Sequence, residues 1–164
     1  MGPMRELPHT HSCFVCGESN PLGLRLRFET DGGLVRARFV PRPEHIGFKS
    51  TVHGGITATI LDEIMVWACG VRTGRFAYCA ELNVRYTSPV RPGEATVATA
   101  ELVADRRGRI FEAKAELRSA AGALLASATG KYIPVKEAEL TAMLDEFVGD
   151  TSLITPPPPP APGA

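Results

Sequence analysis

The sequence carries no surplus charge of either sign. Its 164 residues include 18 lysines and arginines and 18 aspartates and glutamates. Proteins that bind nucleic acids or anionic membranes through charge need a basic surplus, so we expect neither partner here. Uninterrupted apolar runs are also short, and none approaches the ~20 residues that a membrane-spanning helix needs.

Cysteine is scarce as well, and the four residues are Cys13, Cys16, Cys69 and Cys79. Two of them fall inside expected helix or strand, which argues against a framework of disulfides. The first residues, MGPMRELPHTHSC, lack the apolar core of a secretory signal. Together these absences predict a cytoplasmic protein.

The hydrophobic fraction of 44% is enough to build one core, and the length favours a single domain. Apolar and polar residues alternate in segments that end at turns such as DGG, RPG, RRG and AAG. This period of two predicts strands at 24–30, 34–40, 76–90, 93–105, 109–119 and 123–135. The segment 41–51, with two prolines and a glycine, is expected to be a loop.

One long helix is predicted between the second and third strands, over residues 54–72. Apolar residues recur there at helical spacing, and Gly74 offers a stop signal. The helix is apolar around most of its circumference, so a sheet can cover only one side. A second subunit is the simplest cover for the other side. A short helix is expected at 136–149, followed by an extended, mobile Pro-rich tail at 150–164.

This order of elements has a family resemblance. With HGG at 53–55 and an acid nine positions after His53, it resembles the hotdog-fold acyl-CoA thioesterases. The segment CFVCGESNPLGLRLRF (13–28) resembles a signature of their phenylacetate-degradation branch. The resemblance implies an α+β fold, an antiparallel sheet wrapped around a long central helix. It divides the chain into an arm with a CxxC motif (1–23), the hotdog domain (24–135), the helix 136–149 and the tail 150–164.

The resemblance also implies an activity and a site. Members of the family hydrolyse an acyl-CoA thioester to the free acid and CoA as homodimers or homotetramers, without a metal or other cofactor. Matching by position carries over a catalytic Asp62, which acts as nucleophile or general base. It also carries over His53 and the amide of Gly54, which binds the thioester carbonyl, with Gly55 beside it.

Two positions depart from the family pattern. Some relatives have asparagine six residues before the histidine, where this chain has Gly47. Others have serine or threonine where this chain has Cys79, and a thiol is a weaker hydrogen-bond donor than a hydroxyl. A hotdog module that binds acyl-CoA or a related ligand without turnover is therefore the alternative function.

Helix geometry explains why these residue types suit the chemistry. The first amides of a helix have no intrahelical partner and carry partial positive charge, and glycine lets a carbonyl come close. From His53 to Asp62 the helix makes about 2.5 turns and rises roughly 13.5 Å. Asp62 therefore cannot meet the Gly54 amide of its own chain, and the site must be built between subunits.

Neighbouring residues need separate interpretations. Glu63 points about 100° around the helix from Asp62, so both acids cannot serve one spot. Glu63 is expected to be a salt-bridge partner or, with Gly55 and Cys79, to line the substrate pocket. We expect His53 to order the loop rather than to act as the base.

The arm offers an alternative role as a metal site. His9, His11, Cys13 and Cys16 have the ligand types and the CxxC spacing that zinc accepts. Packing of the cysteines in the arm is the other interpretation, and a redox role is disfavoured because no helix follows Cys16. A single CxxC with two histidines in a flexible arm makes a weak cage, so we expect no stoichiometric metal.

Overall fold

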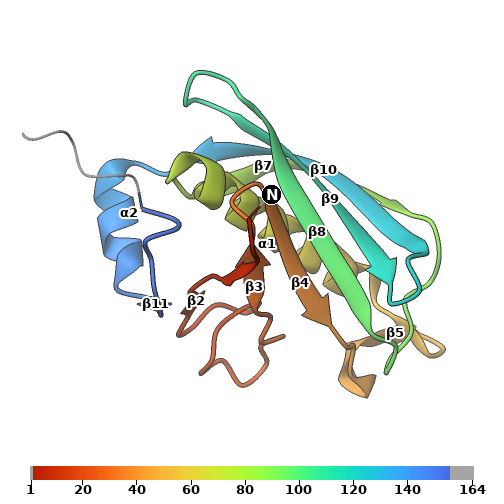
Figure 1. Ribbon diagram of the computed structural model, residues 1–164. Coiled ribbons are helices and arrows are strands. Elements are labelled where there is room, and N and C mark those ends of the chain that lie inside the picture. Colours follow the sequence, from red (N-terminus) through yellow and green to blue (C-terminus); the bar gives the residue numbers. More distant parts are fainter. Residues whose placement is uncertain (1, 156–164) are drawn as a thin grey trace, which may run out of the picture.

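One antiparallel sheet wraps around a central helix, α1 (Gly54–Thr73), in the computed structural model, which describes residues 2–155 (Figure 1). The strand order is β1-β3-β4-β8-β9-β10-β7, and each neighbouring pair is antiparallel. The strands are β1 (Arg5–Glu6), β3 (Phe28–Thr30), β4 (Leu34–Phe39), β8 (Thr96–Asp105), β9 (Phe111–Ser119), β10 (Leu124–Pro134) and β7 (Ala77–Tyr86). The predicted hotdog fold is confirmed.

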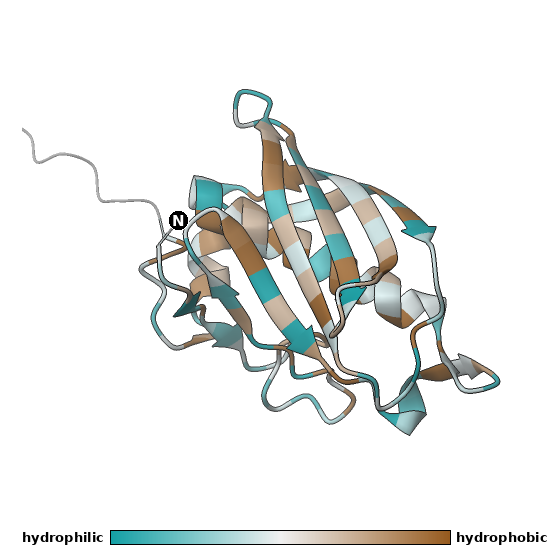
Figure 2. Cartoon of the chain, turned by 45° about the vertical axis from the view of Figure 1, so that its right-hand side comes forward, coloured by the Kyte–Doolittle hydropathy of each residue, from teal (hydrophilic) through white to brown (hydrophobic). Residues whose placement is uncertain are grey.

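The helix can lie close to the sheet because the inner face of the central strands is built from small side chains. Six buried alanines line it: Ala98, Ala100, Ala113, Ala115, Ala126 and Ala128. The helix supplies large buried side chains, including Ile60, Leu61 and Ile64. Polar residues alternate with the alanines and face outward, so hydropathy changes from residue to residue along the strands (Figure 2).

Both ends of α1 have recognisable caps. The His53 imidazole accepts a hydrogen bond from the Gly55 amide, and Gly74 ends the helix in the left-handed region, at φ 69°. The predicted helix is thus confirmed to within a residue. In length and composition α1 is also apolar enough to cross a membrane, which the sequence analysis did not anticipate. Half of its most apolar window is buried inside the fold, and packing against the sheet accounts for that hydropathy.

The N-terminal arm is not flexible over the residues described. β1 pairs with β3, and β2 (His9–Thr10) pairs with β11 (Phe147–Val148) near the other end of the chain. Val15 and Cys16 are buried in the core. The predicted strand 24–30 is correspondingly shorter, because its first residues pair with the arm and Arg25 takes a positive φ.

Part of the cover for α1 comes from the same chain, contrary to expectation. The predicted helix 136–149 ends early, as α2 (Glu137–Leu144), and β11 follows it. The Phe147 ring then packs on Trp67 of α1, with centroids 5.8 Å apart. The predicted tail also starts too early, because Ile154 is buried. The rest of that tail, 156–164, lies outside the described residues.

The predicted loop 41–51 contains a little regular structure. A single 3-10 turn, η1 (Pro43–His45), leads into β5 (Ile46–Phe48), which pairs with β6 (Thr51–Val52). This two-stranded unit stands beside the start of α1, since the His53 amide donates to the carbonyl of His45 at 2.8 Å.

The packed arm makes a stability prediction at Gly17. A Cβ at this position would lie 2.3 Å from the Cys13 carbonyl oxygen, so Gly17→Ala must deform the turn. We expect unfolding by urea to show a loss of about 1–3 kcal/mol, as for other overpacked sites. Gly33→Ala is the matched control, because its methyl group would meet only an Asp31 oxygen, at 3.6 Å. Equal stabilities of the two variants would contradict an ordered arm.

Candidate active site

Asp62 lies in the middle of α1 on a side of the helix that is only partly buried. Its Oδ1 accepts a hydrogen bond from the Tyr132 hydroxyl at 3.0 Å. Tyr132 is fully buried, and burial followed by the charge of Asp62 raises the pKa of its phenol. The phenol therefore stays protonated and serves as a fixed donor to the carboxylate.

A β-bulge supplies a second group on the same side of Asp62. Lys131 of β10 pairs with Glu81 of β7, but the next residue, Tyr132, pairs with Cys79, so Ala80 is the extra residue. The bulge brings Cys79 to the face that carries Leu82, whereas strict alternation along 76–90 placed it on the opposite face. Partial burial and the nearby Asp62 carboxylate raise the pKa of the Cys79 thiol to about 11. Cys79 therefore presents a protonated thiol to Asp62.

A glycine makes room for the tyrosine. A Cβ on Gly130 would lie 2.6 Å from the Tyr132 ring, so the ring lies directly over the backbone of its own strand. Tyr132 was not among the site residues predicted from the sequence. The alternation of 123–135 did put it on the same face as Ala126 and Ala128, and that was the available signal. Nothing in the pattern showed that its hydroxyl reaches α1.

The start of α1 presents one unused donor. The Gly55 amide donates to His53 Nδ1 at 2.9 Å, so His53 orders the helix start as predicted. The Gly54 amide has no hydrogen-bond partner among residues 2–155, whereas the Gly54 carbonyl accepts from the Tyr86 hydroxyl at 2.7 Å. The expected substrate-binding role of Gly55 is therefore not open to its amide, and Gly54 keeps the free N–H.

Gly47, the first departure from the family pattern, lies against His53. A Cβ there would come within 3.0 Å of the His53 Cα. The position is thus beside the helix start, as the resemblance implies, but this backbone has little room for an asparagine. The glycine and the capping histidine fit one another.

Glu63 turns away from Asp62 and toward the arm, so its predicted place in the substrate pocket stays a prediction that these contacts do not support. Its Oε1 accepts a hydrogen bond from the Trp67 indole at 3.1 Å and lies near the thiols of Cys13 and Cys16. Burial, and then the charge of Cys13, raise the pKa of this carboxyl to about 8. The 100° step between adjacent helical residues separates the two acids, as the spacing argument required.

The four predicted zinc ligands of the arm do not come together. His9 Nε2 and His11 Nδ1 lie 2.8 and 3.3 Å from the two oxygens of Glu18, at the surface. The two cysteines instead face Glu63. These four residues therefore do not form the zinc site that was considered as an alternative role for the arm.

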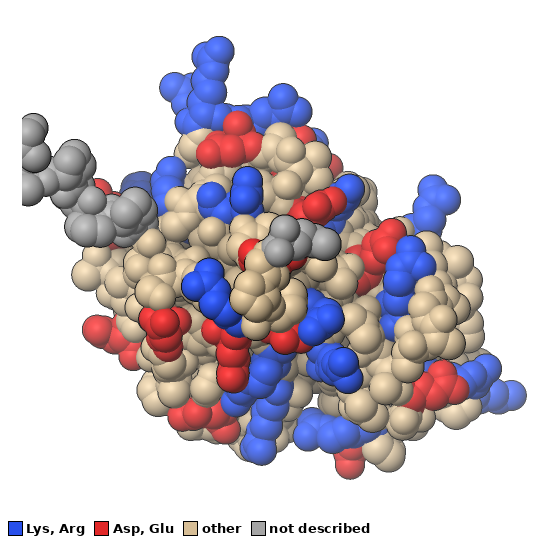
Figure 3. Space-filling view, viewed as in Figure 1, with Lys and Arg blue, Asp and Glu red and all other residues tan. Residues whose placement is uncertain are grey.

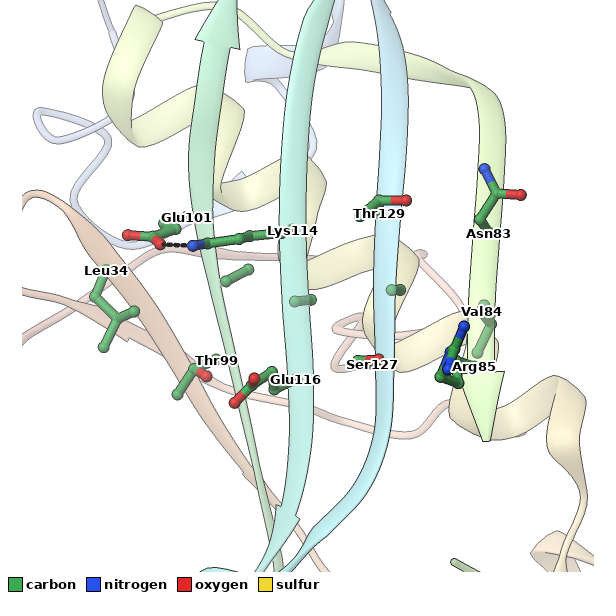
Figure 4. Close-up of a pocket in the computed structure, with 13 residues that line it drawn as sticks. Leu34, Asn83, Val84, Arg85, Thr99, Glu101, Lys114, Glu116, Ser127 and Thr129 are labelled. Carbon is green, nitrogen blue, oxygen red and sulfur yellow. Dashed lines mark ion pairs between the residues drawn. The ribbon is translucent and has the colours of Figure 1, made fainter. Parts of the chain in front are cut away.

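A hollow of about 640 Å³ lies elsewhere, on the outer face of the sheet (Figure 4). Figure 4 shows its polar residues, such as Thr129 and Lys114, in front of the sheet with α1 behind it. Lys114 forms an ion pair with Glu101 at 2.7 Å. The sheet separates this hollow from Asp62, so we do not assign the chemistry to it.

Basic and acidic side chains are interspersed over the molecular face in Figure 3, except at the β8–β9 turn, which carries Arg106, Arg107 and Arg109.

Comparisons with known proteins agree with this geometry. The thioesterase superfamily matches residues 49–127, from just before α1 into β10. Human acyl-coenzyme A thioesterase 13 is 34% identical over 96 residues, which are 57% of this chain and 68% of that protein.

Solved structures share the fold. A thioesterase superfamily protein, RHA08564, superposes with a TM-score of 0.68 at 26% identity, over 76% of this chain but only 60% of that one. PaaI of E. coli, from the phenylacetic acid degradation operon, gives a TM-score of 0.64 at 18% identity, over 69% of this chain and 81% of its own. Together, the helix-borne Asp62, the free amide at the helix start and these similarities show that the chain belongs to the thioesterase superfamily.

Proposed function

We propose that the protein is an acyl-CoA thioesterase whose working carboxylate is Asp62. The observation that carries the proposal is the setting of this side chain, which is partly exposed on α1 and oriented by the Tyr132 hydroxyl. The human relative named acyl-coenzyme A thioesterase 13 supports the substrate class. A module that only binds acyl-CoA would have no need for an oriented carboxylate.

The proposed reaction uses two groups of the site, the Gly54 amide and the Asp62 carboxylate. The Gly54 N–H polarises the thioester carbonyl and stabilises the oxyanion that forms on it. Asp62 takes the proton of a water as that water attacks the carbonyl carbon, or attacks the carbon itself to give an anhydride that water then opens. On the general-base route the carbon–sulfur bond then breaks, and the proton held by Asp62 goes to the departing CoA sulfur. On the nucleophilic route the bond breaks as the anhydride forms, the CoA thiolate takes a proton from solvent, and hydrolysis of the anhydride releases the acid and restores the Asp62 carboxylate. The products are the free acid and CoA.

The Gly54 amide and the Asp62 carboxylate of one site must come from different subunits, so we propose a homodimer, alone or within a homotetramer. β7 supports this assembly, because within residues 2–155 it is an edge strand of the sheet that pairs with β10 alone (Figure 1). Its Tyr78 and Tyr86 are exposed by 59% and 54%. A long apolar edge is normally paired with another chain or protected. Pairing across a twofold axis would lay two α1 helices side by side in opposite directions.

We also propose a cytoplasmic location for the protein. All four cysteines are free, which suits a reducing compartment.

The two adjacent acids provide the first test of mechanism. Asp62→Asn keeps the shape but removes the charge, and we expect release of free thiol from a panel of CoA thioesters to fall ~10²–10⁴-fold. Glu63→Gln should cost much less, because that side chain faces the arm. Circular dichroism of both variants controls for folding. A dead Glu63 variant beside an active Asp62→Asn would show that the wrong acid has been chosen. No thiol release by the unaltered protein would favour the binding module.

The Tyr132 hydroxyl provides a second test. Tyr132→Phe removes the donor that orients Asp62 without changing the ring, and hydrogen bonds to charged groups contribute about 1.5–3 kcal/mol. We expect kcat to fall roughly 10–100-fold with little change in KM, because the ring does not hold substrate. Tyr78→Phe on β7 is the control, because it removes a phenol hydroxyl away from Asp62 and keeps the ring that would pack at the proposed subunit edge, so kcat should stay within about twofold. Equal rates for both variants would remove Tyr132 from the site.

Subunit complementation tests the shared site. Gly54→Val blocks approach to the helix start, whereas Asp62→Asn removes the carboxylate, so each variant alone should be inactive. After unfolding and refolding in a 1:1 mixture, half of the dimers are hybrids with one intact site, which gives roughly a quarter of wild-type activity. Sedimentation should show dimers or tetramers at micromolar concentration. A mixture as inactive as its components, or an active monomer, would contradict a site built between subunits.

A further inference from the structure

Three metal-ligating side chains converge where the arm meets α1. Cys13 and Cys16 come from the arm and Glu63 from the helix, and one ligand atom from each lies within 4.8 Å of the others. The Glu63 Oε1 is 3.7 Å from the Cys13 sulfur and 3.8 Å from the Cys16 sulfur. None of these groups takes part in the thioesterase mechanism above.

We propose that Cys13, Cys16 and Glu63 bind one zinc ion, with water as the fourth ligand. Zinc is held tetrahedrally at about 2.3 Å from thiolate sulfur and about 2.0–2.2 Å from carboxylate oxygen, so sulfur and oxygen ligands of one ion stand roughly 3.5 Å apart. The two sulfur–oxygen distances here exceed that separation by only a few tenths of an ångström. Small side-chain movements would bring all three atoms to one ion. Two thiolates also favour zinc over magnesium or calcium.

The turn that carries the cysteines is tightly fixed. The Val15 amide donates to the Cys13 sulfur at 3.3 Å, and the Gly17 amide donates to the Cys13 carbonyl at 2.8 Å. The missing Cβ of Gly17 is what lets the chain turn this closely. An N–H directed at a sulfur stabilises its thiolate form, which is the form that binds metal.

The Glu63 carboxylate is held in place by a hydrogen bond from Trp67 and has no cationic partner among the described residues. The Trp67 indole donates to the same Oε1 that faces the two sulfurs, at 3.1 Å. Such an outer hydrogen bond is typical of metal-ligating carboxylates. Among the described residues no lysine, arginine or histidine pairs with Glu63. A largely desolvated carboxylate without a cationic partner is unfavourable, and a bound zinc ion would supply the missing charge.

The surroundings favour a metal over a disulfide. A bond between the two sulfurs would consume both thiols and leave the buried carboxylate facing them without a cation. A shallow hollow of about 200 Å³, lined by Cys13, Thr10 and Glu146 among others, reaches the surface and provides access for water and the ion. The ion would tie the arm to α1 one residue from Asp62, and it would stabilise the fold whether or not the protein hydrolyses thioesters.

The experiment uses the full chain, purified in reductant without chelator. The sequence alone predicted no stoichiometric metal, but Glu63 adds a ligand that was not considered there, so we now expect elemental analysis to find about one zinc per chain. After removal of the zinc by a chelator, cobalt(II) should bind and give the near-ultraviolet absorption of thiolate-to-cobalt charge transfer. Cys13→Ser and Glu63→Gln should each lose the zinc and weaken cobalt binding by more than the ~10–100-fold expected for loss of an outer contact. Chelator should lower the melting temperature of the unaltered protein but not that of Cys13→Ser.

Matched variants separate this site from the alternatives. The double variant His9→Ala, His11→Ala should keep its zinc, because both rings pair with Glu18. Cys79→Ser should also keep it, as a control for a free thiol elsewhere. Zinc retained by Glu63→Gln but lost from the histidine variant would overturn the proposed ligand set. If the unaltered protein, once reduced, binds neither zinc nor cobalt, the metal site itself is overturned. This holds even if the sample contained a Cys13–Cys16 disulfide before reduction.

Discussion

The close contact between α1 and the alanine-lined centre of the sheet sets the position of every other functional group. Because six of the facing positions are alanine, the helix lies within reach of hydroxyls and thiols on the flanking strands. A larger residue at these positions would move α1 outward, and the 3.0 Å contact between Tyr132 and Asp62 would be lost. The chemistry therefore depends on residues that have no polar atoms of their own.

Two adjacent acids on one helix have separate environments for a simple geometric reason. A step of one residue turns the side chain by about 100°, which is enough to point Asp62 at the sheet edge and Glu63 at the arm. Each acid then takes its properties from its surroundings. Both acids are partly buried, but Asp62 accepts from the Tyr132 hydroxyl, whereas the Glu63 carboxyl is desolvated beside two sulfurs and its pKa rises to about 8.

The sequence predicts the frame of this protein well and its local contacts less well. Alternation and turn residues located every long strand, and the helix from Gly54 onward follows from its apolar period and the Gly74 stop. The bulge at Ala80 could not be seen, because an extra residue in one strand leaves no mark in the pattern of either strand alone. The role of Cys79 beside Asp62 depends on that bulge.

The errors near the chain ends have a similar origin. The arm was expected to be flexible, residues 136–149 to be one helix and the tail from 150 to be mobile. Their order comes from contacts with distant residues, such as β2 with β11 and Phe147 with Trp67, which no local pattern encodes. For the same reason the histidines and cysteines of the arm, close in sequence, could not be assigned to separate partners.

The position of Phe147 has a consequence for how the chain folds as it is synthesised. Its ring completes the aromatic cluster around Trp67, which already contains Phe28 and Phe76, and it comes from the last regular element described. While the chain is still emerging from the ribosome, α1 and the sheet can assemble, but that side of Trp67 stays uncovered until the final segment arrives. The helix is thus closed by a contact between residues 80 positions apart, and such distant contacts form late and slowly.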